Sequence, residues 1–331
     1  MNTYNNKKTF IILSGPTAVG KTAATERFSQ KLPVEVVNAD VGQFYAPLSI
    51  GTAKPGLSAQ SSTQSSVLHH GFDLFTEPVD FSALAYRAYI EKTIHEVWSR
   101  GNIPLITGGS LFYLWSLFFV PGGAVDEDFE GACSEKESHS SLDFDREAAW
   151  QLLLEKDPLR ARDLEKTKDP YRLRRALDLL AEGKMPSARA PLYTPIEGSP
   201  YFIFLTRERS ELYERINQRV FEMMAQGWLR EVEGLPLAWR TFLEKKKLLG
   251  YGEILRYLSC DEEGRDYDLL LECIQQKTRQ YAKRQLTFWR KFARSLEREM
   301  GALAKTSICE ANLTLSTLDL YIEQVMGNLN R

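Results

Sequence analysis

The chain alternates between short apolar runs and longer stretches in which apolar residues recur every three or four positions. The short runs are rich in Val, Ile, Leu and Phe and are typical of buried parallel strands. They cover residues 9–13, 34–40, 103–107 and 201–205. Residues 21–32 and 81–100 have the spacing of amphipathic helices. Strands that alternate with helices predict an α/β fold built on a parallel sheet.

The composition changes between residues 121 and 200, where an acidic, serine-rich stretch precedes two helical patterns at 146–156 and 170–183. Because an apolar strand resumes at 201–205, we interpret residues 121–200 as a helical insertion into the core. Four more helices are expected at residues 210–226, 228–235, 248–258 and 267–298.

The predicted division is a core of residues 1–120 and 201–300, the insertion at 121–200, and a C-terminal tail at 301–331. The tail has no pattern to which we assign a function.

Composition and charge narrow the class of protein. The chain has 331 residues, of which 43% are hydrophobic, and a net charge of −2, so a nucleic-acid partner would have to bind local basic patches. The longest apolar run, residues 111–120, is well under the ~20 residues of a membrane span. The four cysteines form no C-x-x-C pair, and the four histidines lack metal-ligand spacing. We therefore expect a reduced, cytoplasmic protein with no membrane partner.

A phosphate-binding loop is predicted directly after the first strand. The sequence fits G-x-x-x-x-G-K-[ST] and comprises Gly15, Pro16, Thr17, Ala18, Val19, Gly20, Lys21 and Thr22. A strand before the motif and a helix after it are the context in which backbone N–H groups surround a phosphate. Lys21 adds a positive charge and Thr22 a hydroxyl for Mg²⁺. The alternative is a glycine turn before an ordinary helix.

Two other strand ends carry candidate chemistry. Asp40 ends the second strand and is expected to face the phosphate loop, although Asp is also a common helix or turn cap. The third strand ends in Gly108-Gly109-Ser110, whereas a nucleotide-hydrolysing protein places an acid there to help hold Mg²⁺. A glycine pair lets another molecule approach the backbone closely.

Two helices carry basic clusters. Arg172, Arg174 and Arg175 lie near the start of an insertion helix, where they oppose the helix dipole, so they indicate a bound anion or a solvated charged face. The helix at 267–298 interleaves basic and aromatic residues, a pattern suited to RNA or to an ordinary amphipathic helix. These residues are Lys277, Arg279, Tyr281, Lys283, Arg284, Phe288, Trp289, Arg290, Lys291 and Arg294.

Taken together, these motifs resemble those of bacterial tRNA dimethylallyltransferases over residues 10–291. The matching blocks are Gly15 to Thr22, Asn38-Ala39-Asp40, residues 50–55 (IGTAKP), residues 104–113 (PLITGGSLFY), residues 174–177 (RRAL), residues 212–216 (LYERI) and residues 278–287 (TRQYAKRQLT). The resemblance implies transfer of the dimethylallyl group of dimethylallyl diphosphate to the exocyclic amine of the adenosine 3′ to the anticodon, with Mg²⁺. It also implies a monomer with a phosphate-loop NTPase-like core, a helical C-terminal region, and a helical insertion that grips the anticodon stem-loop.

The same resemblance implies roles for particular residues. Residues 15–22 and Arg209 would bind the donor diphosphate, Thr22 the metal, and Asp40 would accept the amine proton. Thr17 would also be catalytic, as would Ser110, which stands where the family has Thr. The implied tRNA contacts are Asp40, Val41, Gly42, Gln43, Lys54, Ser110, Tyr171, Arg172, Leu173, Arg174, Arg175, Lys247, Gly250, Tyr251, Arg279, Lys283 and Arg284.

Departures from the family pattern affect the expected RNA contacts. Residues 122–141 do not match the family's arginine-bearing segment, Tyr171 replaces a common amide, and Gly252 replaces a common basic residue. Three other functions share part of the pattern: a small-molecule kinase, a prenyltransferase acting on free adenine nucleotides, and a non-catalytic RNA-binding module. Because no strand-end acid is present for an ATP-bound metal, we expect the loop to prefer a prenyl diphosphate to ATP.

Overall fold

The computed structural model describes residues 8–55, 67–121, 144–189 and 191–329. The chain divides into two compact units. Unit 1 comprises Met1–Val79, Arg87–Trp115 and Ile196–Arg331, and unit 2 comprises Asp80–Tyr86 and Ser116–Pro195. The main segment of unit 2, residues 116–195, therefore starts and stops five residues earlier than the predicted insertion, residues 121–200. Unit 2 also includes residues 80–86.

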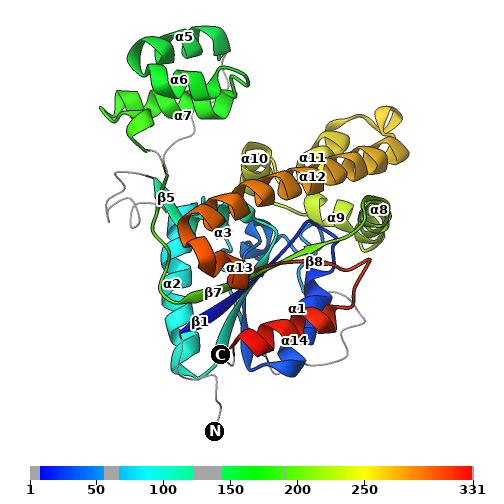
Figure 1. Ribbon diagram of the computed structural model, residues 1–331. Helices are drawn as coiled ribbons and strands as arrows, with labels where there is room; N and C mark the ends of the chain where they lie inside the picture. The colour runs from blue at the N-terminus through cyan, green and yellow to red at the C-terminus, as the bar shows by residue number, and fades with distance from the viewer. Residues whose placement is uncertain (1–7, 56–66, 122–143, 190, 330–331) are drawn as a thin grey trace. The chain divides into compact units, whose positions relative to one another are not determined.

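Unit 1 contains a six-stranded parallel sheet in the order β3-β2-β4-β1-β7-β8 (Figure 1). The strands are β1 (Thr9–Ser14), β2 (Val34–Asn38), β3 (His69–His70), β4 (Ile103–Gly108), β7 (Ser199–Thr206) and β8 (Ile308–Asn312). The predicted α/β fold is confirmed. β3 and β8 were not predicted, because β3 is only two residues long and β8 lies in the part of the chain treated as a tail.

The register of the sheet brings the candidate loops together. In β1, Ser14 pairs with Gly108 of β4 and with Phe204 of β7, while Asn38 of β2 pairs with Thr107 of β4. Since the strands are parallel, their carboxyl ends meet at one edge of the sheet. The segments that follow β1, β2 and β4 are therefore neighbours at that edge.

The C-terminal residues belong to the sheet and its helices. β8 pairs with β7 in parallel, and α14 (Leu318–Leu329) lies beside α1 (Lys21–Lys31) (Figure 1). Arg27 donates two hydrogen bonds to the Asp319 carboxylate, at 2.9 and 3.1 Å, and Lys31 lies 3.0 Å from the same group. Residues 301–331 were predicted as a separate tail, but β8 pairs with β7 and covers the edge that β7 would otherwise expose.

The remaining elements of unit 1 are mainly helices. They are η1 (Val41–Phe44), α2 (Ala83–Ser99), α3 (Leu111–Ser116), α8 (Arg209–Ala225), α9 (Trp228–Glu233), α10 (Leu237–Lys246), α11 (Tyr251–Ser259), η4 (Glu262–Gly264), α12 (Tyr267–Met300), η5 (Gly301–Leu303) and α13 (Ala304–Ser307). The start of α2 and the last residue of α3 fall in unit 2. Helices α8 to α12 share an apolar core that includes Trp228, Trp239 and Leu243.

Helix α12 is docked on the sheet by aromatic packing. The ring of Trp289 stacks on Phe204 of β7 with a centroid distance of 4.3 Å and an interplanar angle of 1°. Its indole N–H donates to Glu310 of β8 at 2.7 Å. The sequence left open whether the residues of this helix bind RNA or pack in the core. The structure places the aromatic Trp289 in the core.

Unit 2 has a small helical core of its own. Its elements are α5 (Arg146–Lys156), α6 (Pro158–Leu164), α7 (Pro170–Ala181), η3 (Pro186–Arg189) and the antiparallel pair β5 (Phe119–Pro121) and β6 (Pro191–Tyr193). Leu153, Leu164 and Leu173 are each at most 1% exposed and pack together. Buried Asp157 links the elements, since its carboxylate accepts from the backbone N–H of Arg160 and of Ser187.

Two features are absent from the described residues, a membrane-spanning helix and a disulfide bond. Within the described ranges, no helix combines the length and the apolar character required to cross a membrane. Cys260, Cys273 and Cys309, in the part of the chain that the structure describes, are free thiols.

A buried carboxylate stabilises the edge of the sheet opposite to the candidate loops. Glu35 is 1% exposed and accepts two hydrogen bonds from Arg100, at 2.8 and 2.7 Å, and one from Asn102 at 2.8 Å. Burial by itself raises the pKa of this carboxyl, but hydrogen bonds from Arg100, Asn102 and His70 lower the pKa from 4.5 to about 2. Its stabilising effect is therefore present above pH 4.5 and is lost as the pH falls toward about 2.

We expect Glu35→Gln to reduce the free energy of unfolding by on the order of 2–3 kcal/mol at pH 7. The reason is that a carboxyl whose pKa is lower in the folded than in the unfolded protein stabilises the folded state. Urea unfolding at pH 7 and at pH 3 measures this effect. The difference from wild type should shrink at pH 3, and Glu96→Gln, at an exposed position of α2, is the control. Equal differences at the two pH values would contradict the assigned role of the charge.

Candidate active site

A large cavity with a volume of about 1070 Å³ lies in unit 1 at the carboxyl edge of the sheet. Its walls come from the phosphate loop, the segments after β2 and β4, helices α8 and α12, and the loop of residues 49–55. The predicted residues Thr17, Lys21, Asp40 and Ser110 all line it. The fold thus brings together candidates that are up to 93 positions apart in the sequence.

The phosphate loop is held in shape by side chains on both sides. Lys21 donates its ammonium to the carbonyls of Gly15 and Pro16, both at 3.0 Å. From the other side, Arg207 Nε donates to the carbonyl of Val19 at 2.8 Å. Because a trans peptide directs its C=O and N–H to opposite sides, this bond turns the N–H of Gly20 away from Arg207. The loop is therefore preorganised before an anion binds.

The predicted donor residue Arg209 is not part of this arrangement. Its guanidinium lies over the ring of Tyr213, 5.1 Å from the centroid, and it is not among the residues that line the cavity. Arg215, six residues further along α8, donates to the carbonyl of Ala18 at 2.9 Å, and Arg219 lines the cavity. Arg207 and Arg215 thus contact the backbone of the phosphate loop, and Arg215 and Arg219 line the cavity, whereas the role of Arg209 in donor binding stays a prediction.

Lys21 and Asp40 form an electrostatic pair across the glycine at the end of β4. A Cβ built on Gly109 would lie 3.7 Å from both Asp40 Oδ2 and Lys21 Nζ. Burial lowers the pKa of Lys21 to about 8, which the nearby Asp40 partly opposes. Burial also raises the pKa of Asp40, against the opposing effects of Lys21 and Arg219. A carboxylate with a raised pKa is a stronger base than one in water.

Hydrogen bonds fix the position of Asp40. The side-chain oxygen of Asn38 accepts from the N–H of Asp40 at 2.9 Å, and the Asn38 amide donates to the carbonyl of Gly71 at 2.9 Å. Asp40 accepts from the N–H of Gly42 at 3.3 Å and so caps η1. Both interpretations made from the sequence hold, because the same carboxylate caps a turn and faces the loop.

Ser110 lies next to this carboxylate. Its hydroxyl oxygen accepts from the N–H of Val41 at 3.0 Å, and its own N–H donates to the carbonyl of Ala39 at 3.1 Å. The hydroxyl of Ser110 therefore links the end of β4 to the turn that begins at Asp40.

The glycine pair after β4 accommodates the protein's own chain. A Cβ on Gly108 would lie 2.2 Å from the backbone of Ala39, and one on Gly109 would lie 2.6 Å from Gln285 Nε2. Gln285, buried on α12, donates to the carbonyl of Gly109 at 2.8 Å and accepts from the N–H of Thr17 at 2.9 Å. The expectation that the pair admits another molecule is corrected, since these neighbours fill the space.

Several predicted RNA contacts are instead internal to the protein. Buried Lys54 donates to the carbonyl of Tyr45 at 3.0 Å and forms an ion pair with Asp73. Leu173 is fully buried in the core of unit 2. A Cβ on Gly250 would lie 1.9 Å from the ring of Trp228, so this glycine serves packing.

The other predicted contacts near Asp40 join the turn to the neighbouring loop. Gln43 donates to the carbonyl of Thr52 at 3.0 Å, and Gly42 packs against the Thr52 side chain. Val41 packs against the apolar core of α8 to α12, and Tyr251 donates its hydroxyl to Glu231 at 2.8 Å.

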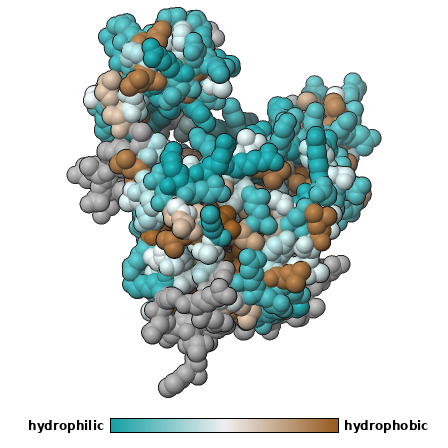
Figure 2. All heavy atoms as spheres, in the orientation of Figure 1, coloured by the Kyte–Doolittle hydropathy of each residue, from teal (hydrophilic) through white to brown (hydrophobic). Residues whose placement is uncertain are grey.

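Exposed basic groups remain on two surfaces. Figure 2 shows hydrophilic side chains along the exposed side of α12, where Lys283 and Arg284 are exposed. Arg279 of the same helix is half-buried and donates to the Asn217 side chain at 2.5 Å. In unit 2, Arg172 and Arg175 are exposed on α7.

On the same helix of unit 2, Tyr171 is 78% exposed. The guanidinium of Arg174 stacks on the ring of Phe144, 4.8 Å from its centroid. Arg174 therefore packs within unit 2, whereas the Tyr171 ring is exposed to solvent.

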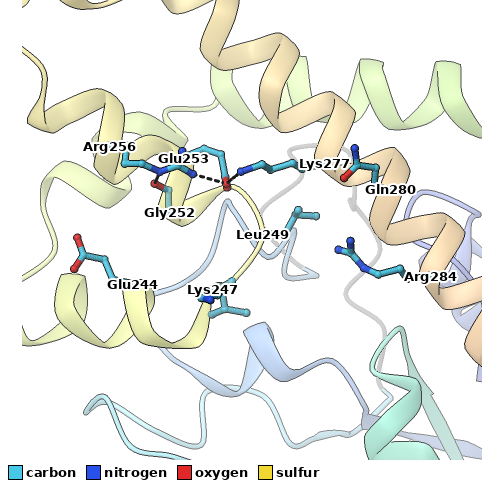
Figure 3. Close-up of a pocket in the computed structure, with 10 residues that line it drawn as sticks. Glu244, Lys247, Leu249, Gly252, Glu253, Arg256, Lys277, Gln280 and Arg284 are labelled. Carbon is cyan, nitrogen blue, oxygen red and sulfur yellow. Dashed lines mark hydrogen bonds and ion pairs between the residues drawn. The ribbon is translucent and has the colours of Figure 1, made fainter. Parts of the chain in front are cut away.

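A second cavity of about 540 Å³ lies between α10, α11 and α12 (Figure 3). Glu253 sits between Arg256 and Lys277, at 2.9 and 2.5 Å, and Figure 3 shows these contacts as dashed lines. Lys247 and Arg284 also line the cavity. Basic groups thus outnumber acidic ones on its walls, as a polyanion requires.

The donor set limits how a metal ion could bind. Across the described ranges, no three His, Cys, Asp or Glu side chains are grouped to hold a metal ion. Thr22 lines the large cavity next to Lys21. Such a site fits Mg²⁺, which keeps several waters and takes the rest of its ligands from phosphates and one or two protein groups.

A family model described as IPP transferase matches residues 43–292 of the chain. The chain belongs to this family. Curated relatives include tRNA dimethylallyltransferase 2 of Geotalea daltonii, 34% identical over 85% of this chain and 84% of the relative. The tRNA dimethylallyltransferase of Alkaliphilus metalliredigens is 33% identical over 93% of this chain and 96% of the relative.

Solved structures of IPP transferases share the fold. A tRNA delta(2)-isopentenylpyrophosphate transferase from Staphylococcus epidermidis is 24% identical, with a TM-score of 0.60 over 97% of this chain and 99% of that one. A eukaryotic dimethylallyltransferase acting on tRNA is also 24% identical, with a TM-score of 0.69 over 96% of this chain and 77% of that one.

The sequence analysis did not identify three kinds of residue that support the segments around this cavity. Gln285 and Asn38 lie inside matched blocks, but no periodicity indicates that they hold Thr17 and Asp40. Glu231 has no motif of its own. A signal was available for the arginines, because Arg207, Glu211, Arg215 and Arg219 are spaced by four residues, which places the last three on one face of α8.

Proposed function

We propose that the chain transfers the dimethylallyl group of dimethylallyl diphosphate to the exocyclic amine of the tRNA adenosine 3′ to the anticodon, releasing diphosphate. The observation that carries the proposal is the proximity of Lys21 and Asp40 in one cavity, since a Cβ on Gly109 would lie 3.7 Å from both side chains. A cationic phosphate loop beside a carboxylate base supplies both requirements of this reaction, a stabilised leaving group and a proton acceptor.

The reaction forms one bond and breaks one. The adenine nitrogen attacks the allylic carbon of the donor while the bond from that carbon to the diphosphate oxygen breaks. The bond's electron pair leaves with the diphosphate, whose growing negative charge is neutralised by Lys21 and the loop N–H groups. The proton of the amine passes to the carboxylate of Asp40.

Other residues hold these groups in place. Gln285 ties Thr17 of the loop to Gly109, and Ser110 ties the end of β4 to the turn after Asp40. Thr22 would hold Mg²⁺ together with the donor phosphates, and the ion would supply further positive charge to the leaving group.

The RNA partner is supported by the position of the basic groups. Lys247 and Arg284 line both cavities of unit 1, which suits an RNA backbone that passes over the site while one base enters it. The exposed Tyr171, Arg172 and Arg175 of unit 2 would contact the anticodon stem-loop. We further propose that the protein acts as a monomer in the cytoplasm.

Incubation with radiolabelled dimethylallyl diphosphate and Mg²⁺ tests the proposal. We expect label to enter unmodified tRNA and an anticodon stem-loop but not AMP. Label in AMP alone would favour a transferase acting on free nucleotides, because that reaction needs the donor site and not the basic surfaces. Mg²⁺-dependent binding of ATP without binding of dimethylallyl diphosphate would favour a kinase.

A further inference from the structure

Glu231 of α9 is hydrogen-bonded to the loop that walls the large cavity. Its Oε2 accepts from the N–H of Ser49 at 2.9 Å and of Ile50 at 2.6 Å. Its Oε1 accepts from the N–H of Gly51 at 3.2 Å and from the hydroxyl of Tyr251 at 2.8 Å. One carboxylate thus binds four donors, three of them consecutive backbone groups, and hydrogen bonds to a charged acceptor are the stronger kind.

The loop held in this way contacts the turn that carries Asp40. Gln43 donates to the carbonyls of Thr52 and Ala53, at 3.0 and 3.4 Å. A Cβ on Gly42 would lie 2.7 Å from Thr52 Cγ2, so the two segments are in close contact. The N–H of Gly42 is also the donor to Asp40. A continuous set of contacts therefore runs from Glu231 through the loop to the carboxylate base.

The loop cannot move toward α9 to compensate for a lost hydrogen bond. A Cβ on Gly51 would lie 2.0 Å from Trp228 Nε1 and 2.6 Å from the ring of Tyr251. The Thr52 hydroxyl donates to the carbonyl of Leu48 at 2.7 Å, which closes the loop on itself. The loop therefore has one close-packed position against α9, and the Glu231 carboxylate holds it there.

We propose that Glu231 is a positioning residue for the RNA acceptor, which fixes the loop of residues 49–54 and, through it, the turn at Asp40. The inference rests on the proposed function, since the acceptor is the RNA that enters this cavity. The proposed donor site is the phosphate loop, and in the described part of the chain the four hydrogen bonds of the Glu231 carboxylate go to other segments. Loss of the carboxylate therefore affects the acceptor and leaves the donor in place.

The test is Glu231→Gln in the full chain, because the side chain keeps its size but turns one acceptor into a donor that faces other donors. We expect KM for an anticodon stem-loop RNA to rise about tenfold or more, with donor affinity within about twofold of wild type. Hydrogen exchange at Ser49, Ile50 and Gly51 should accelerate. Glu233→Gln, at an exposed position of the same helix, should behave as wild type.

An unchanged RNA KM in a folded Glu231→Gln protein would overturn the inference, as would an equal loss of donor and RNA affinity. If that variant does not fold, Tyr251→Phe decides, because it removes one of the four hydrogen bonds and keeps the ring. A rise in RNA KM of about twofold or more, with donor affinity unchanged, is then expected. An unchanged RNA KM in Tyr251→Phe would overturn the inference. Absence of transfer by the wild-type protein would instead refute the proposed function.

Discussion

Asp40→Asn is expected to lower the single-turnover rate of prenyl transfer by roughly 10²–10⁴-fold, the range over which a positioned general base contributes. The change keeps the shape of the side chain but removes its charge and nearly all its basicity. Asn is among the best capping residues, and its oxygen can still accept from the N–H of Gly42. The binding constants for donor and tRNA should therefore stay within a few-fold of wild type.

The matched control for this variant is Asp266→Asn. Asp266 caps α12 by accepting from the N–H of Leu269 at 2.9 Å, and it is not among the residues that line the large cavity. This control should keep wild-type activity. Full single-turnover activity in Asp40→Asn would show that Asp40 serves only as a cap, since the two substitutions would then be equivalent.

Lys21→Ala is expected to lower the rate of transfer at saturating donor by on the order of 10²-fold or more, because the ammonium neutralises charge that develops on the diphosphate. Lys31→Ala is the control, since Lys31 lies at the other end of the same helix and pairs with Asp319. An unchanged rate at saturating donor would limit Lys21 to ground-state binding.

A second effect of Lys21→Ala follows from the pairing with Asp40. The positive charge of Lys21 lowers the pKa of Asp40, against the larger effect of burial. Without that charge the Asp40 pKa rises further, so the acid limb of the pH profile of kcat/KM should move to higher pH. A profile whose acid limb does not move would show that Asp40 does not set it.

The sequence by itself determined four of the six strands of the sheet, β1, β2, β4 and β7, and the phosphate loop. Strands such as residues 103–107 are short apolar runs, and the glycine-lysine motif lies between a strand and a helix, so local periodicity and spacing carry the information. The same reasoning placed Asp40 beside the loop, because parallel strands end at a common edge.

The sequence was less informative where one residue has two possible environments. The family resemblance implies RNA contacts for Leu173, Lys54 and Gly250, yet their side chains or backbones are packed inside the protein. A linear motif records that a residue type is required at a position. It does not record whether a ligand or the protein's own core requires it.

Only the tertiary structure decided which distant residues support the site. Arg207 reaches Val19, Gln285 reaches Thr17, and Glu231 reaches Ser49 across 182 positions of sequence. It also placed β8, which was assigned to a separate tail, as the sixth strand of the sheet. Such contacts arise when helices dock through their buried faces, and local periodicity gives no information on the partner of each face.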